Sequence, residues 1–242
     1  MIHIREAGAG PALLLLHAFP YDSRQWDRQI ETFSARLRVL APDFPGFGRS
    51  AAPPGGITLN DAARELLDRL HELGVRRAIV VGNSMGGYLA FALFRIDPEL
   101  FSGFGFVNSR AAADGAAAKG QRAALIDKAK AQGVGFLLAG ASDAERRMLA
   151  GVAPAGYVAG QLAIAERPDA TALLPSITCP ASVIWGMADA LVPLSEAKAT
   201  AAALPDCVFE PIDGAGHVPS LDKPAEVSAA LQRLASRCGA FS

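Results

Sequence analysis

The residues with the clearest capacity for chemistry lie in the segment Gly82-Asn83-Ser84-Met85-Gly86-Gly87, which contains the pattern G-x-S-x-G. An apolar run at 78–81 predicts a buried strand before it, and residues 85–96 predict a helix after it. A strand–turn–helix junction of this kind is so tight that only small neighbours fit around the serine. Ser84 then stands exposed at a helix N-terminus, where free N–H groups favour developing negative charge. The segment therefore predicts a nucleophilic serine.

Glycine-rich strand–helix turns also bind phosphate groups, so that alternative has to be weighed. A dinucleotide site would carry G-x-G-x-x-G, and a phosphate-binding P-loop would carry G-K-[ST]. The segment around Ser84 has neither pattern. A catalytic serine is therefore the better interpretation.

A serine hydroxyl needs a base to remove its proton, and the chain offers four histidines. His3 falls on an edge-like first strand and His71 on a polar helix face, where surface positions are expected. His17 ends the second predicted strand. His217 lies in a loop after the last predicted strand, at the carboxyl end of the sheet, where a base can reach Ser84. We therefore predict His217 as the base.

The third member of such a site orients the imidazole and stabilises its charged form. Asp189 lies just beyond the carboxyl end of the strand predicted at 182–185. Asp213 is a competing acid close to His217, and we rank it lower because an acid on a separate strand end holds the ring more rigidly. The order serine, acid, histidine along the chain then predicts Ser84, Asp189 and His217 as a triad.

The elements that would position these residues alternate along both ends of the chain. Strands are predicted at 2–5, 12–16, 37–40, 78–81, 104–107, 182–185 and 208–211, with helices between most of them. From about 110 to 174 no strand is predicted, and helical segments are expected near 116–131, 143–149 and 155–166. The pattern predicts an α/β fold with a mostly parallel, doubly wound sheet at 1–109 and 175–242, interrupted by a helical insertion at 110–174.

The composition narrows the classes of protein that this chain can be. It has 242 residues, 51% of them hydrophobic and 19% charged, with 23 Lys+Arg against 24 Asp+Glu. Balanced charge argues against a nucleic-acid partner, and no polybasic or long apolar segment indicates a membrane. Three cysteines, Cys179, Cys207 and Cys238, lack metal-ligand spacing, so we expect no metal, reduced thiols and a cytoplasmic location.

Taken together, these segments resemble the α/β-hydrolase-fold family, in its small, capped, serine-triad form that includes esterases and enol-lactonases. The resemblance covers essentially the whole chain. It rests on His17-Ala18-Phe19-Pro20, on residues 43–50 and 82–87, on Gly186 with Asp189, and on Gly216-His217. It implies Ser84 as nucleophile, Asp189 as acid, His217 as base and the insertion at 110–174 as a cap over the site.

The same resemblance implies an oxyanion hole made of two backbone N–H groups, those of Met85 and Phe19. The chain departs from the family in having Ala18 where glycine is commonest, and His17 becomes a structural residue that holds this loop. Side chains that flank the triad or lie in the cap are expected to line a small, mostly apolar substrate pocket. The residues expected there are Phe19, Phe136, Leu137, Val192 and Val218.

The expected function is hydrolysis of a small carboxylic ester or lactone through an acyl-serine intermediate, without a cofactor. Ser84 argues against the branches of the family that use an aspartate nucleophile. Carbon–carbon bond hydrolases and cofactor-free perhydrolases share the triad, and a ligand-binding signalling module on the same fold is a further alternative. An enol-lactonase acting on a dicarboxylate would need cap arginines. We expect the four available, Arg110, Arg122, Arg146 and Arg147, to be solvated.

Overall fold

One sheet of seven strands forms the centre of the molecule, in the order β1-β3-β2-β4-β5-β6-β7. The computed structural model describes residues 1–241. β1 pairs antiparallel with β3, and every other pairing is parallel. The strands are β1 (Ile4–Ala7), β2 (Ala12–Leu16), β3 (Arg38–Pro42), β4 (Ala78–Asn83), β5 (Phe101–Val107), β6 (Ala181–Gly186) and β7 (Cys207–Ile212). The predicted fold class, an α/β fold with a mostly parallel sheet, is confirmed.

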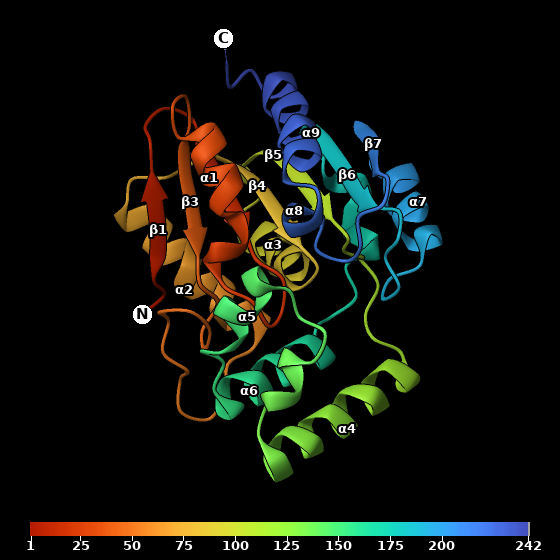
Figure 1. Cartoon of the computed structure of the whole chain (residues 1–242). Helices are drawn as coiled ribbons and strands as arrows, with labels where there is room; N and C mark the ends of the chain where they lie inside the picture. The colour runs from red at the N-terminus through yellow and green to blue at the C-terminus, as the bar shows by residue number, and fades with distance from the viewer. Residues whose placement is uncertain (242) are drawn as a thin grey trace.

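Helices cover both faces of this sheet because its strands are apolar on both sides (Figure 1). On β2, Leu13 and Leu15 pack with helices α1 and α9, whereas Leu14 and Leu16 pack in a second cluster with α2, α3 and α7. The helices of this core are η1 (Ser23–Trp26), α1 (Asp27–Phe33), α2 (Leu59–Glu72), α3 (Met85–Ile96), η2 (Pro98–Leu100), α7 (Leu194–Ala203), α8 (Pro219–Asp222) and α9 (Pro224–Arg237).

The structure corrects the sequence predictions in a few places. β5 begins at Phe101 rather than Phe104, because Ala78 of β4 pairs with Phe101 and Ile79 pairs with Gly103. The register shifts between these two pairs. The short helix α8 after His217 was not predicted. His3 precedes β1 instead of lying on it, and both His3 and His71 are half-buried rather than on the surface.

Residues 110–174, here called the cap segment, contain helices and no strand. The helices are α4 (Ala116–Gln132), η3 (Gly135–Leu138), α5 (Asp143–Leu149), α6 (Pro154–Ala165) and η4 (Thr171–Ser176), between β5 and β6. Figure 1 shows α4, α5 and α6 beyond the carboxyl ends of the parallel strands. The boundaries at 110 and 174 remain predictions, and η4 runs across the second of them.

Helix α6 packs directly against loops of the core through two glycines. A Cβ atom at Gly156 would overlap the carbonyl oxygen of Gly46, which lies in the loop after β3. A Cβ atom at Gly160 would lie 2.7 Å from the Phe19 ring and 3.1 Å from the Phe47 ring. Such close approach leaves no room for larger residues, so α6 is packed tightly against the core at these two positions.

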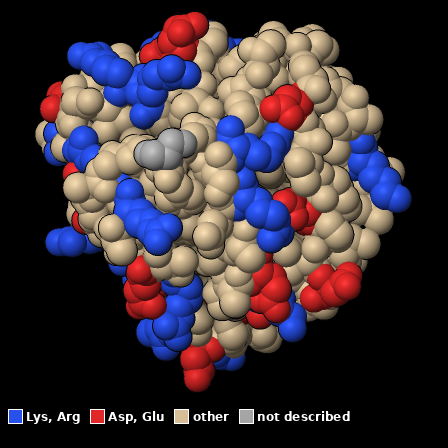
Figure 2. All heavy atoms as spheres, turned by 90° about the horizontal axis from the view of Figure 1, so that it is seen from above, with Lys and Arg blue, Asp and Glu red and all other residues tan. Residues whose placement is uncertain are grey.

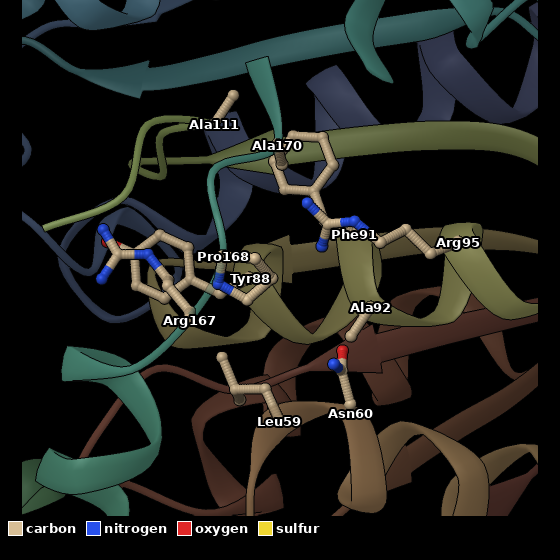
Figure 3. Close-up of a pocket in the computed structure, with 10 residues that line it drawn as sticks. All are labelled: Leu59, Asn60, Tyr88, Phe91, Ala92, Arg95, Ala111, Arg167, Pro168 and Ala170. Carbon is tan, nitrogen blue, oxygen red and sulfur yellow. The ribbon is translucent and has the colours of Figure 1, made fainter. Parts of the chain in front are cut away.

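The two connections between the cap segment and the core run side by side. Ala170 N–H donates to the Ala111 carbonyl at 2.9 Å, and Arg167 Nη2 donates to the Ala112 carbonyl at 2.9 Å. Figure 3 shows the Arg167 guanidinium over the Tyr88 ring of α3, with its Cζ atom 3.9 Å from the ring centroid. We call this region the neck.

A fully buried carboxylate, that of Asp114, holds the neck together. Its oxygens accept from Arg110 Nη2 at 2.6 Å, from Arg167 Nη1 at 2.9 Å and from Arg122 Nε. Burial opposes ionisation of Asp114, but the hydrogen bond from Arg122 and the charge of Arg167 hold its pKa below the ordinary value. The structure therefore corrects the expectation that Arg110 and Arg122 are simply solvated.

In the described residues 1–241, no single helix is long and apolar enough to cross a bilayer, and only α5 and α6 together, bent by 98°, pass that test. The same residues contain no group of three or more His, Cys, Asp or Glu that could hold a metal ion.

Figure 2 shows cationic and anionic side chains interspersed over the face opposite the cap segment. Burial raises the pKa of each of the three unpaired cysteines to about 11.

We predict that Asp114→Asn destabilises the protein by about 3–5 kcal/mol at pH 7, because it leaves buried guanidinium groups without their counter-charge. The folded-state pKa of Asp114 is lowered, so its contribution is present above the unfolded pKa of about 3.9 and is lost as the pH falls through the folded value. Urea unfolding at pH 7 and near pH 3 checks this. A gap between wild type and variant that stays constant down to pH 3 would contradict it.

Candidate active site

The turn between β4 and α3 holds Ser84 in a strained conformation. Its backbone angles are φ 50° and ψ −111°, in the left-handed region that non-glycine residues rarely adopt. Ser84 N–H donates to the Val107 carbonyl at 2.9 Å, which ties the turn to β5. A Cβ atom at Gly82, Gly86 or Gly87 would overlap a neighbouring backbone or the Ser109 hydroxyl, so each glycine is required by space.

His217 lies between Ser84 and Asp189. Its Nε2 atom is 2.8 Å from Ser84 Oγ, and its Nδ1 atom is 2.9 Å from Asp189 Oδ2. The three side chains come from the ends of β4, β6 and β7, which meet at the carboxyl edge of the sheet. Asp213, the competing acid, is exposed. The structure thus brings together the three residues that the sequence singled out.

The Asp189 carboxylate is buried and held from several sides. Asn108 Nδ2 donates to Oδ2 at 2.7 Å, and Leu191 N–H donates to Oδ1 at 2.8 Å. Burial disfavours the ionised carboxylate, yet the hydrogen bond and charge of His217 and the hydrogen bonds from Asn108 and Leu191 together outweigh it and lower the pKa of Asp189. Asp189 is therefore ionised at neutral pH and oriented toward the imidazole.

Asn108 is a site residue that the sequence analysis missed. It follows β5 directly, has φ 42°, and accepts from Gly186 N–H at 2.8 Å while it donates to Asp189. A polar residue directly after a buried strand, at the edge that carries Ser84, was the available indication.

A buried amide network joins the three loops of the site. Gln25 Oε1 accepts from Ala18 N–H at 2.8 Å, and Gln25 Nε2 donates to Asn83 Oδ1 at 2.9 Å. Asn83 Nδ2 in turn donates to the carbonyls of Val107 at 2.9 Å and His217 at 3.1 Å. The loop after β2, the Ser84 turn and the His217 loop are therefore connected directly.

The loop after β2 forms a four-residue turn, in which Tyr21 N–H donates to the Ala18 carbonyl at 2.9 Å. The turn presents the Phe19 backbone, and Met85 N–H lies at the start of α3. Within residues 1–241 neither N–H group donates to another backbone carbonyl outside the regular helices and strands. Their role as the two oxyanion donors remains a prediction.

His17 supports this turn from below as a structural residue. It is buried, its Nδ1 atom lies 2.9 Å from the Ala18 carbonyl, and its Nε2 accepts from Phe44 N–H at 2.8 Å. These contacts fit a neutral ring with the proton on Nδ1, and burial lowers the pKa of His17. The structure agrees with the structural role expected for this histidine.

Comparison with known proteins connects this geometry to a family. The model of the alpha/beta hydrolase family matches residues 13–230. The chain belongs to this family. Among solved structures, a thermophilic esterase from Thermogutta terrifontis with malate bound is 32% identical, with a TM-score of 0.92 over 98% of this chain and 93% of that chain. The enol-lactonase from Burkholderia xenovorans LB400 is 22% identical, with a TM-score of 0.88 over 97% and 96%, and shows the shared fold.

Several curated relatives match this chain over shorter stretches. An epoxide hydrolase from Caballeronia sordidicola is 37% identical over 103 residues, which is 41% of this chain and 31% of that protein. This chain therefore covers less than a third of that relative's length. Membership of this family and the similarity to the esterase support a hydrolase, and the enol-lactonase shows the same fold.

Aromatic side chains connect the loop after β2 of the hydrolase to its cap segment. The Phe19 ring packs against Phe47 at 5.5 Å and against Tyr157 of α6 at 5.0 Å between centroids, and Phe136 packs edge-on against Tyr157 at 5.8 Å. Among the predicted pocket residues, Phe19 and Phe136 are therefore brought together through Tyr157. Leu137 is half-buried and packs against the core. Val192 and Val218 are buried, and they follow Asp189 and His217 closely in the sequence.

We predict that Asn108→Ala lowers kcat/KM of the hydrolase by about 10- to 100-fold, because a hydrogen bond to a charged group is worth about 1.5–3 kcal/mol. Steady-state kinetics on an ester substrate measures this, with Asn60→Ala on α2 as the matched control. Since Asn108 acts through Asp189, Asn108→Ala added to Asp189→Asn should cost little more than Asp189→Asn alone. Additive losses would contradict the assignment.

Proposed function

We propose that this hydrolase cleaves a small carboxylic ester or lactone through an acyl-serine intermediate. The observation that carries the proposal is the chain of short contacts from Ser84 Oγ through both nitrogens of His217 to Asp189. A serine on a strained turn, beside a base that is itself oriented by a buried carboxylate, is the arrangement that activates a hydroxyl nucleophile.

The geometry gives each group one task in the reaction. His217 Nε2 removes the Ser84 proton as Oγ attacks the acyl carbon, and Asp189 stabilises the imidazolium that forms. The N–H groups of Phe19 and Met85 donate to the oxyanion, each worth about 2.7–4 kcal/mol in the transition state.

The second half of the reaction regenerates the enzyme. His217 gives its proton to the leaving alkoxide, which departs as an alcohol from an ester and stays attached to the acyl group from a lactone. Water, deprotonated by His217, then attacks the acyl-serine, and Ser84 is released with its proton restored.

Aromatic side chains on the residue that carries the proposed Phe19 donor, and next to it, support a substrate with apolar parts. Phe19 of the loop after β2 and Tyr157 and Phe136 of the cap segment form a continuous row of ring contacts, here called the aromatic wall. The esterase and enol-lactonase of similar structure act on ester bonds, in line with this assignment. Carbon–carbon bond hydrolysis, perhydrolysis and ligand sensing use the same triad. The experiments below distinguish them from ester or lactone hydrolysis.

The first test is hydrolysis of p-nitrophenyl acetate and butyrate by wild type, Ser84→Ala and His217→Ala. We expect turnover in wild type and a loss of about 10⁶-fold in kcat for either variant, because the residues of such a triad act as a unit. Ser195→Ala, at an exposed serine on α7, is the matched control and should retain wild-type rates.

Three other results would redirect the assignment. Release of one equivalent of p-nitrophenol per protein without further turnover would favour a ligand-binding module with a reactive Ser84. Equal activity in Ser84→Ala would show that the nucleophile is misassigned. Absence of ester hydrolysis, with peroxyacid formation or carbon–carbon cleavage instead, would favour the alternatives.

A second prediction concerns the aromatic wall. Phe136→Ala should raise kcat/KM for p-nitrophenyl hexanoate relative to acetate by about 10-fold, because each methylene accommodated in an apolar pocket is worth about 1–3 kcal/mol. Leu162→Ala, at an exposed apolar residue on α6, is the control and should leave the ratio unchanged. An unchanged ratio in Phe136→Ala would remove that residue from the pocket.

A further inference from the structure

One hydrogen bond connects the oxyanion turn to the cap segment. Tyr21 Oη, on the last residue of the turn, donates to Glu145 Oε1 of α5 at 2.6 Å. The two residues are 124 positions apart in the sequence, and the contact is partly buried. Tyr21 also packs against the main apolar cluster of the core. The contact is therefore an ordered bridge between the core and the cap segment.

The Glu145 end of this bridge is fixed by its own helix. Glu145 Oε2 accepts from Ser142 N–H and Ser142 Oγ, each at 2.8 Å, and Glu145 N–H donates back to Ser142 Oγ. This capping box defines the start of α5 and leaves only Oε1 for Tyr21. Burial opposes ionisation of the Glu145 carboxyl group, but the hydrogen bonds from Tyr21 and Ser142 lower its pKa. The acceptor is therefore charged at neutral pH.

The Tyr21 end of the bridge is the turn that carries the Phe19 N–H group. From the core side, Gln25 holds Ala18 N–H, the first residue of the turn. From the cap side, the Phe19 ring lies against Tyr157 and Gly160 of α6. Tyr21 adds a polar contact to α5, so two different cap helices hold the two protruding side chains of one turn.

We propose that the Tyr21–Glu145 hydrogen bond is a positioning contact that couples docking of α5 to the placement of the Phe19 oxyanion donor. It rests on the proposed function, because it assigns a cause to the order of the oxyanion hole in that reaction. The cap segment is then part of the catalytic apparatus as well as a cover over the site.

This coupling acts on the transition state more than on substrate binding. An oxyanion donor is effective only within about 2.7–3.1 Å of the developing charge, and the uncharged carbonyl of the bound ester depends on it far less. A turn released from α5 therefore lowers kcat, whereas a residue that only lines the pocket rim changes KM in a way that depends on the acyl chain.

The experiment is a double-mutant cycle with Tyr21→Phe and Glu145→Gln on p-nitrophenyl acetate and butyrate. Tyr21→Phe keeps the ring and removes only the donor. Glu145→Gln keeps the capping box of α5, in which glutamine also serves, and removes the charge of the acceptor. We expect Tyr21→Phe to lower kcat about 10-fold for both esters with KM within about twofold of wild type. The double variant should be no slower than Tyr21→Phe alone.

Hydrogen exchange gives a readout that does not require turnover. In Tyr21→Phe the hydrogen-bonded backbone amides of Ala18 and Tyr21 and those of α5 should exchange faster, whereas those of β4 and α3 should not change. Hydrogen exchange tests the coupling between α5 and the turn even if wild type does not hydrolyse the esters. That failure would overturn the proposed function but not the coupling.

The proposal is overturned by any of three results. These are an unchanged kcat in Tyr21→Phe, a change confined to KM, or losses that add in the double variant. Unchanged exchange at the Ala18 and Tyr21 amides would overturn it as well.

Discussion

The strained turn at Ser84 is the constraint on which the rest of the site depends. Holding a serine at φ 50° costs of order 1–3 kcal/mol, and that cost persists only where surrounding structure fixes the backbone on both sides. Here β4 is buried along its whole length, β5 accepts the Ser84 N–H, and three glycines remove the side chains that would block the turn. The sheet supplies the rigidity, and the turn uses it to present one hydroxyl.

Buried amides transmit that rigidity to the neighbouring loops. Gln25 and Asn83 contact the loop after β2, the serine turn and the histidine loop, so these three segments share one set of hydrogen bonds. Asn108 does the same for the acid by joining Asp189 to the end of β5 and to Gly186. Loops of a folded protein are usually its mobile parts, and this network is what makes them fit for a reaction that tolerates little displacement.

The sequence was sufficient for the sheet, most helices and the residues brought together at Ser84, because these depend on local patterns. Apolar runs mark strands buried on both faces, and the carboxyl ends of parallel strands meet at one edge. It was insufficient for Gln25, Asn108 and the Tyr21–Glu145 contact, since these depend on side-chain directions across distant segments. Asp114 was missed for the same reason. Its role follows from three arginines that only the folded neck brings within reach.

The neck also bears on how this chain could have acquired its cap. Ala111 and Ala170 are hydrogen-bonded to each other, so the segment between them leaves and re-enters the core at adjacent positions, as a short loop would. Because the ends of the segment are already adjacent, changing the length between them adds only a slowly growing loop-closure entropy. Residues between these alanines can therefore change in length or sequence while the two ends stay paired. Asp114 and Arg167 both lie between these alanines, whereas Arg110 stays with the core, so a replacement segment without an acid at the position of Asp114 would leave Arg110 without its counter-charge.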